Sequence, residues 1–235
     1  MKTKQYKSFI ISFVVLFILV PIIIFISQSN NSNYLLSSFM IIFVSFLPFV
    51  YIFEKKKIRV REIVLISSMS AIAVLGRIVF FFVPQIKATS AIIIVSAATL
   101  GSEAGFFIGV VSAFVSNFFF GQGSYTIWQM FAFGMVGFLS GIIFKSERIK
   151  NNRILVCIIG FILILLVYGG IVNFHSLVLY TSKINFESFK AVYLLSLPFD
   201  FIHALSTSVF LWFIQRPFFE KIDRIKEKYG IIYHR

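Results

Sequence analysis

The chain has 235 residues, of which 59% are hydrophobic, 18% are aromatic and only 13% are charged. Soluble domains carry about 25% charged residues, so this composition excludes an ordinary soluble protein. The net charge of +13 does not indicate a nucleic-acid-binding protein, because the charges form short runs between apolar segments, as orientation signals do in membrane proteins. The one cysteine, Cys157, lies in an apolar run and excludes a disulfide framework within the chain.

Eight apolar segments follow one another along the chain. Most are long enough to cross the hydrocarbon core of a bilayer, which takes about 20 helical residues, and none alternates like a transmembrane β-strand. The first segment is longer than an ordinary signal-peptide core and is interpreted as a retained helix. We therefore predict an all-α integral membrane protein with transmembrane helices at about 9–26, 34–53, 62–83, 86–100, 103–120, 127–144, 154–175 and 190–214.

Lysine and arginine residues indicate on which side of the membrane each loop lies. If the N-terminus is cytoplasmic, 18 of the 22 Lys and Arg residues fall on the inner side, 3 fall on the outer side, and Arg77 remains within a helix. Cytoplasmic loops carry an excess of positive residues, so this asymmetry favours eight helices with both termini in the cytoplasm. Omitting the short fourth segment, which contains Lys87, would move the basic loop 145–153 outside and spoil the pattern.

The chain divides into two parts. Residues 1–60 hold the first two helices, which contain almost no polar residues apart from serines, and a charged linker from Glu54 to Glu62 joins them to the rest. Residues 61–235 form a six-helix core with a basic cytoplasmic tail, and this core carries all the unusual polar residues. We therefore expect the functional site in the core.

Two charged residues lie within predicted helices of the core. A charge at mid-membrane costs about 3 kcal/mol on insertion scales, so such residues are functional by default. Arg77 lies in the outer half of its helix and Asp200 lies near mid-depth of the last helix, at depths that allow an ion pair. His203 follows Asp200 by about one helical turn, on a similar face. These residues either neutralise one another and pack within the bundle, or they belong to a ligand pocket.

The stretch from Asn117 to Met130 gathers amide groups and aromatic rings at the outer surface. Its Gly121-Gln-Gly123 turn lets the backbone approach another group closely. The candidate ligand contacts are Asn117, Gln122, Tyr125, Trp128 and Gln129. Flat apolar area combined with directional hydrogen bonding suits a sizeable, mostly uncharged ligand. The alternative is an aromatic belt with a tight turn, which explains Tyr125 and Trp128 but not the three amides.

Small residues recur at intervals of three or four along several helices. Such faces let neighbouring transmembrane helices approach closely, so we expect them at helix–helix contacts. The pattern occurs at Gly101, Gly105, Gly109 and Ala113, at Gly134, Gly137 and Gly141, and at Ser67 and Ala71.

Several catalytic and cofactor-binding patterns are absent from the sequence. It has no Gly-x4-Gly-Lys-Ser/Thr loop, no His-Glu-x2-His motif, no paired intramembrane carboxylates and no Cys/His cluster. His203 is the only histidine expected deep in the membrane, and no serine lies in a Gly-x-Ser-x-Gly motif. We therefore expect no catalytic residue, no metal site and no cofactor. The alternative of an intramembrane lipid-modifying enzyme lacks a nucleophile.

Four blocks of the sequence carry a resemblance to a known family. They are Arg61–Arg77, Pro84–Lys87, Asn117–Gly123 and Trp128–Gly134. The chain resembles substrate-specific (S) components of energy-coupling factor (ECF) importers over about residues 61–215, and within them it looks most like the cobalamin-type group. The most specific part is Asn-Phe-Phe-Phe-Gly-Gln-Gly followed by Trp-Gln-Met. The chain departs from that group at Ser124–Ile127, where proline and tryptophan are common.

The resemblance implies a subunit of the bacterial cytoplasmic membrane that captures a vitamin outside and topples to deliver it inside. It implies a transmembrane coupling subunit and two ATPase subunits as partners, with Ser67 and Ala71 at the position of the family's Ala-x3-Ala contact with the coupling subunit. It also implies that external loops near 84–87, 121–126 and 176–189 lie over the pocket. The first-choice ligand is cobalamin or a related corrinoid, and the alternatives are riboflavin, a queuosine precursor and folate.

Overall fold

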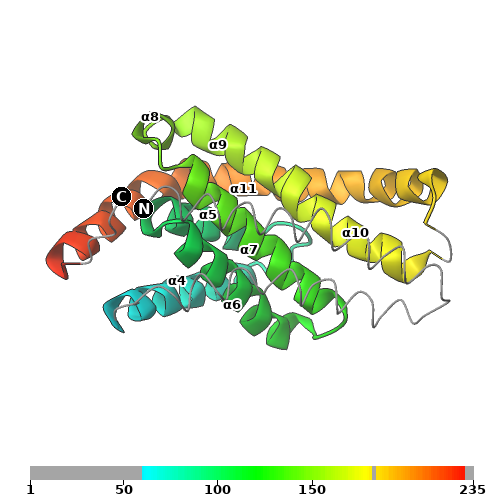
Figure 1. Cartoon of the computed structure of the whole chain (residues 1–235), viewed down its shortest axis with the longest axis horizontal. Helices are drawn as coiled ribbons and strands as arrows, with labels where there is room; N and C mark the ends of the chain where they lie inside the picture. Colours follow the sequence, from blue (N-terminus) through cyan, green and yellow to red (C-terminus); the bar gives the residue numbers. More distant parts are fainter. Residues whose placement is uncertain (1–59, 182–183, 231–235) are drawn as a thin grey trace, which may run out of the picture.

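The computed structural model describes residues 60–181 and 184–230, and every regular element within them is a helix (Figure 1). The all-α prediction is therefore confirmed for this part of the chain. The elements are α4 (Val60–Ile78), α5 (Thr89–Leu100), α6 (Ser102–Phe120), α7 (Tyr125–Ile143), the short α8 (Glu147–Lys150), α9 (Arg153–Ile162), the π-helix η2 (Leu163–Tyr168), α10 (Gly169–Tyr180) and α11 (Phe186–Lys228).

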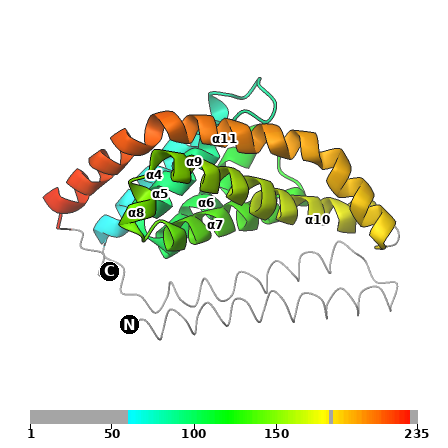
Figure 2. The ribbon, with the colours of Figure 1, turned by 90° about the horizontal axis from the view of Figure 1, so that it is seen from above.

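Each of the six segments predicted from residue 62 onward corresponds to helical structure. The segment predicted at 154–175 is one rod in which η2 joins α9 to α10, and this rod runs beside α11 (Figures 1 and 2). Within the described residues, four helical stretches are long and apolar enough to cross a membrane, and α5 is a shorter apolar helix. The helices predicted at 9–26 and 34–53 lie outside the described residues, so the total of eight and the cytoplasmic termini stay predictions.

The prediction that the third helix continues to residue 83 is wrong. Helix α4 ends at Ile78, and residues 79–88 form a loop of turns that projects from the bundle beside α11 (Figure 2). Pro84 has no backbone N–H, and Gln85 has a φ of 59°, a left-handed conformation that a helix excludes. Because residues 79–83 are all apolar, the hydrophobic pattern of the sequence did not indicate that the helix ends before them.

Helix α11 is longer than the predicted span 190–214. At its start, Asn185 accepts a hydrogen bond from the backbone N–H of Ser188 (2.8 Å) and forms a capping box with that residue. Beyond residue 214, Phe219 and Ile222 stay buried against the bundle, and Lys226 donates a hydrogen bond to the carbonyl oxygen of Thr99 (2.9 Å). These tertiary contacts extend the helix past the apolar stretch that the sequence revealed.

The glycines of α6 and α7 bring these helices into close contact, as predicted. A Cβ atom on Gly137 would lie 2.1 Å from the carbonyl oxygen of Gly105, and one on Gly109 would lie 2.3 Å from that of Phe133. Gly141 approaches the backbone of Ser102 in the same way. Because no side chain separates the backbones, α6 and α7 form the tightest pair in the described bundle and hold the ends of both helices in register.

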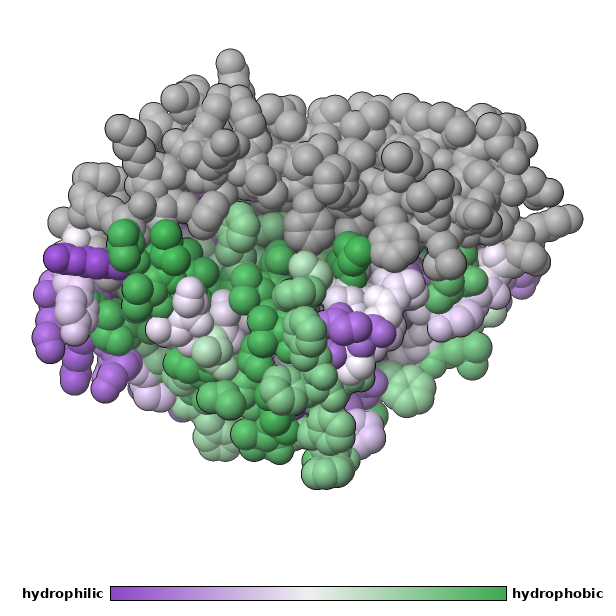
Figure 3. Space-filling view, turned by 90° about the horizontal axis from the view of Figure 1, so that it is seen from below, coloured by the Kyte–Doolittle hydropathy of each residue, from purple (hydrophilic) through white to green (hydrophobic). Residues whose placement is uncertain are grey.

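Large apolar side chains cover the outside of the bundle as well as its core. Phe82, Phe118, Leu195 and Phe213 are all exposed. Hydrophobic residues spread across the middle of the face in Figure 3, and hydrophilic residues gather at its left end. Soluble proteins avoid apolar surfaces of this extent, so the solvent of this surface is the lipid of a membrane.

We expect Gly137→Ala to destabilise the protein, because the added methyl group would overlap the backbone of Gly105. Overpacking of this kind costs about 1–3 kcal/mol, which thermal unfolding of the detergent-solubilised chain would detect. Gly170→Ala is the matched control, since a Cβ there meets nothing within 4 Å. Equal melting temperatures for the two variants would contradict the close approach of α6 and α7.

Candidate ligand-binding cavity

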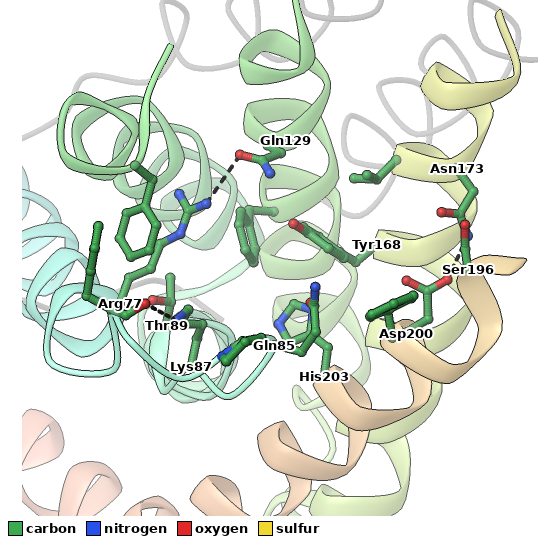
Figure 4. Close-up of a pocket in the computed structure, with 16 residues that line it drawn as sticks. Arg77, Gln85, Lys87, Thr89, Gln129, Tyr168, Asn173, Ser196, Asp200 and His203 are labelled. Carbon is green, nitrogen blue, oxygen red and sulfur yellow. Dashed lines mark hydrogen bonds between the residues drawn. The ribbon is translucent and has the colours of Figure 1, made fainter. Parts of the chain in front are cut away.

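A cavity of ≈ 490 Å³ opens where the end of α4, the loop 79–88, α7, the η2–α10 rod and α11 meet (Figure 4). Aromatic rings form much of its wall, and charged and amide groups lie between them. The aromatic lining residues are Phe81, Phe120, Phe133, Tyr168 and Phe199, and the charged ones are Arg77, Lys87 and Asp200. The cavity thus combines apolar area with a few directional polar groups, as ligand pockets in proteins do.

Arg77 is held in the cavity wall by several side-chain hydrogen bonds. Its exposed fraction is 8%, and its Nη1 donates to Ser116 Oγ (2.6 Å) and Asn117 Oδ1 (2.7 Å). Its Nη2 lies 3.5 Å from Gln129 Oε1, and Asn117 Nδ2 donates to the same oxygen (3.0 Å). The guanidinium also lies over the ring of Phe120, 4.5 Å from the centroid. Residues of α6 and α7 therefore hold the arginine of α4 in a fixed position.

The ion pair that the depths of Arg77 and Asp200 allow is not formed. Every hydrogen-bond acceptor around Arg77 is neutral, and neither charged side chain has an oppositely charged partner in contact among the described residues. Ion pairs of the described bundle join Asp223 to Lys150 and to Lys226. The two intramembrane charges come from different walls of the cavity, so simple mutual neutralisation does not explain them.

Asp200 is held by α10. Its Oδ2 accepts a hydrogen bond from Asn173 Nδ2 (2.6 Å). The carboxylate lies against Gly169, where a Cβ atom would be only 2.9 Å from Oδ2. Tyr193 fastens α11 to α10 nearby, because its hydroxyl donates to the carbonyl oxygen of Gly170 (2.8 Å). Within the described residues no donor reaches Oδ1 of Asp200, so this oxygen is available to a ligand.

His203 lies between the two charged walls. It is buried, its Nε2 is 2.8 Å from Ser90 Oγ on α5, and its ring meets that of Tyr168 edge-on at 4.9 Å. Figure 4 shows His203 and Tyr168 between Arg77 on one side and Asp200 on the other. The π-helix η2 ends at Tyr168, and such irregular turns are frequent at functional sites.

Lys87 organises the loop between α4 and α5. Its Nζ donates hydrogen bonds to the carbonyl oxygens of Phe80 and Val83, the latter at 2.7 Å, and lies 5.3 Å from the centroid of Phe120. Burial, and to a smaller extent the positive charge of Arg77, lowers the pKa of Lys87 from its ordinary value. The Lys87 side chain thus lines the cavity and ties the loop to it.

The sequence-predicted contacts of the Asn117–Met130 stretch separate into two groups. Gln129 lines the cavity. Asn117 does not line it, but its Oδ1 accepts a hydrogen bond from Arg77, which does. The other three lie outside the cavity wall: Gln122 donates to a backbone carbonyl of α6 (3.2 Å), Tyr125 donates to Gly121 O (2.6 Å), and Trp128 is buried against Phe174 and His175. A tight turn with packed aromatic residues accounts for these three.

Sequence reasoning missed Tyr168, Asn173 and His175. His175 on α10 is buried, with Nε2 3.3 Å from Ser124 Oγ, so His203 is not the only deep histidine. Asn173 was identifiable as a polar residue in an apolar run, and the predicted helix ended too early to place His175 at depth. No local signal marks Tyr168, because its place in the cavity depends on η2.

Comparison with known proteins identifies the family of the chain. A family model described as the substrate-specific component of the ECF transporter matches residues 61–214, more than half of the chain. The chain belongs to this family. Substrate-specific components are transporter subunits of the cell membrane rather than enzymes, and their family indicates the uptake of vitamins or other micronutrients. Searches of curated proteins and of solved structures found no significant match.

Two further features bear on a substrate-specific component. Ser67 and Ala71 are both exposed on α4, on a different face from the buried residues that line the helix from Glu62 to Arg77. In the described part of the chain, no group of three or more His, Cys, Asp or Glu residues could hold a metal ion.

We expect Asn117→Ala to weaken ligand binding and to destabilise the core, because it leaves Arg77 and Gln129 without their shared partner. An unsatisfied buried group costs about 1–3 kcal/mol, and 1.4 kcal/mol corresponds to tenfold in affinity. Gln122→Ala is the control, since that amide is exposed and outside the cavity. Calorimetry and thermal unfolding of both variants test this, and an equal loss in both would contradict a specific role for Asn117.

Proposed function

We propose that this substrate-specific component captures a micronutrient from outside the cell in the ≈ 490 Å³ cavity and delivers it inward with a coupling subunit and two ATPase subunits. The observation that carries the proposal is the pair of uncompensated intramembrane charges, Arg77 and Asp200, on opposite walls of one cavity. Charged groups are kept within membranes at functional sites. Arg77, Gln129, Asp200 and His203 are the proposed substrate-contacting residues, with Asn117 behind them.

The size and lining of the cavity favour a vitamin smaller than a corrinoid. Pockets of about 300–1,000 Å³ enclose drug-sized ligands, and the cavity lies in the lower part of that range. Gln122, Tyr125 and Trp128, which suggested a large amide-rich ligand, have partners within the protein. Cobalamin therefore becomes the second choice, and a compact heterocyclic vitamin such as folate, riboflavin or a queuosine precursor becomes the first.

The orientation in the membrane follows from charge. The start of α4 meets the end of α11, where Arg61 Nη1 donates to Tyr229 O (2.6 Å), and α11 carries most of its basic residues near this end. Positive residues favour the cytoplasmic side, so the opposite end, with the loop 79–88 and the cavity, faces outward. We infer a bacterial cell membrane, cytoplasmic termini, and entry of the ligand from outside.

Binding of a vitamin panel by the purified full-length chain tests the proposal. We expect isothermal titration calorimetry to detect one tight ligand among folate, riboflavin, a queuosine precursor, pantothenate, pyridoxamine 5′-phosphate, thiamine and cyanocobalamin. Binding of cyanocobalamin alone would keep the transporter function and reject the preference for a small ligand. No binding by a folded, monodisperse sample would contradict a stand-alone capture subunit.

The exposed pair Ser67 and Ala71 is the proposed contact with the coupling subunit. Small residues on an exposed helix face allow another helix to approach closely. We expect Ala71→Trp to abolish co-purification with the coupling subunit and ATPases while leaving vitamin binding unchanged. Ala191→Trp is the control, because Ala191 is exposed on α11. Equal recovery of the complex with both variants would place the contact elsewhere.

A further inference from the structure

The charges of the cavity are arranged as two opposite ends. Arg77 and Lys87 lie on one side, at α4 and the loop 79–88, and Asp200 lies on the other side, on α11 (Figure 4). The Phe120 ring links the positive groups, because Arg77 Cζ is 4.5 Å and Lys87 Nζ is 5.3 Å from its centroid. The cavity therefore has a positive end and a negative end.

The positive end lacks a counter-ion within the described residues. Arg77 donates only to neutral oxygens, those of Ser116, Asn117 and Gln129. The ammonium group of Lys87 is directed to backbone carbonyls, including a longer contact to Phe81 O (3.5 Å). Lys87 thus contributes positive potential while its donors are occupied by the loop. In a site with little water, such a potential favours an anionic ligand group.

The negative end also lacks a counter-ion in the described bundle. Asp200 has one hydrogen-bond donor, Asn173, at Oδ2 (2.6 Å), and Oδ1 is available. Arg77 is the intramembrane cation of the cavity, and it is held on the opposite wall by α6 and α7. A ligand group that carries positive charge, or several N–H donors, would complete this end.

From this polarity we infer that the ligand is dipolar, with an acidic group that binds at Arg77 and Lys87 and an amino group or amino-substituted ring that binds at Asp200. This inference rests on the proposed function of the cavity and names the chemical class of its substrate. The aromatic rings between the two ends, Phe133 and Tyr168, lie 4.5 Å apart between centroids and provide apolar surface for the middle of such a molecule.

Gly169 is a positioning residue for the negative end. A Cβ atom there would lie 2.9 Å from Oδ2 and 3.0 Å from Cγ of Asp200. Gly169→Ala would therefore move the carboxylate without removing it. The next residue offers a matched control, because a Cβ on Gly170 meets nothing within 4 Å.

The test compares vitamins of different charge on the purified full-length protein. Folate and pyridoxamine 5′-phosphate carry both an acidic group and an amino group, whereas pantothenate, thiamine, riboflavin, a queuosine precursor and cyanocobalamin lack this combination. We expect the tight ligand to be one of the first two. Asp200→Asn, which preserves shape and removes the charge, should weaken its binding at least tenfold, and Gly169→Ala should weaken it in the same direction.

Matched variants distinguish a specific loss of ligand binding from a general destabilisation of the protein. Asp223→Asn lies on the same helix, outside the cavity, and should change the affinity less than twofold, as should Gly170→Ala. Tight binding of a vitamin from the second group, or equal affinity of the wild type and Asp200→Asn, would overturn the inference and leave the proposed function standing. Failure of the folded wild type to bind any of the seven vitamins would overturn the proposed function, and the inference with it.

Discussion

The buried guanidinium of Arg77 is the constraint on which the rest of the site depends. A positive charge within a membrane is stable only where polar groups replace its hydration, and here Ser116, Asn117 and Gln129 supply neutral oxygens at 2.6–3.5 Å. These partners come from α6 and α7, which glycine contacts hold together without intervening side chains. The tight helix pair therefore keeps the arginine in place at the cavity wall, and no carboxylate cancels its charge among the described residues.

On the opposite wall, the negative charge of Asp200 is likewise held by neutral groups. Gly169, which directly follows the π-helix η2, leaves the space that the Asp200 carboxylate fills, and Asn173 holds one of its oxygens. Because each charge is fixed by its own neutral partners, both can remain apart on facing walls. No internal ion pair between the two side chains would therefore have to be broken for a ligand to bind between them.

The sequence predicted the fold class and the helical core, and it singled out Arg77, Asp200 and the Asn117 amide, because polar residues stand out in apolar helices. It did not predict the end of the third helix at Ile78, the length of α11 or the place of Tyr168. These depend on tertiary contacts, such as the hydrogen bond of Lys226 to Thr99 and the position of η2. Of the two interpretations of Arg77 and Asp200 that the sequence left open, the mutual ion pair is not formed, since depth in the membrane gives no information about lateral position.

The most direct test of the cavity as the capture site is the vitamin affinity of Arg77→Gln, measured by calorimetry beside Arg153→Gln. Both variants remove one arginine charge from a helix, but Arg153 lies over the Trp212 ring, outside the cavity. We expect Arg77→Gln to bind its vitamin at least tenfold more weakly than the wild type, about 1.4 kcal/mol, and Arg153→Gln to bind normally. A folded Arg77→Gln protein with wild-type affinity would contradict the assignment of this cavity to the substrate.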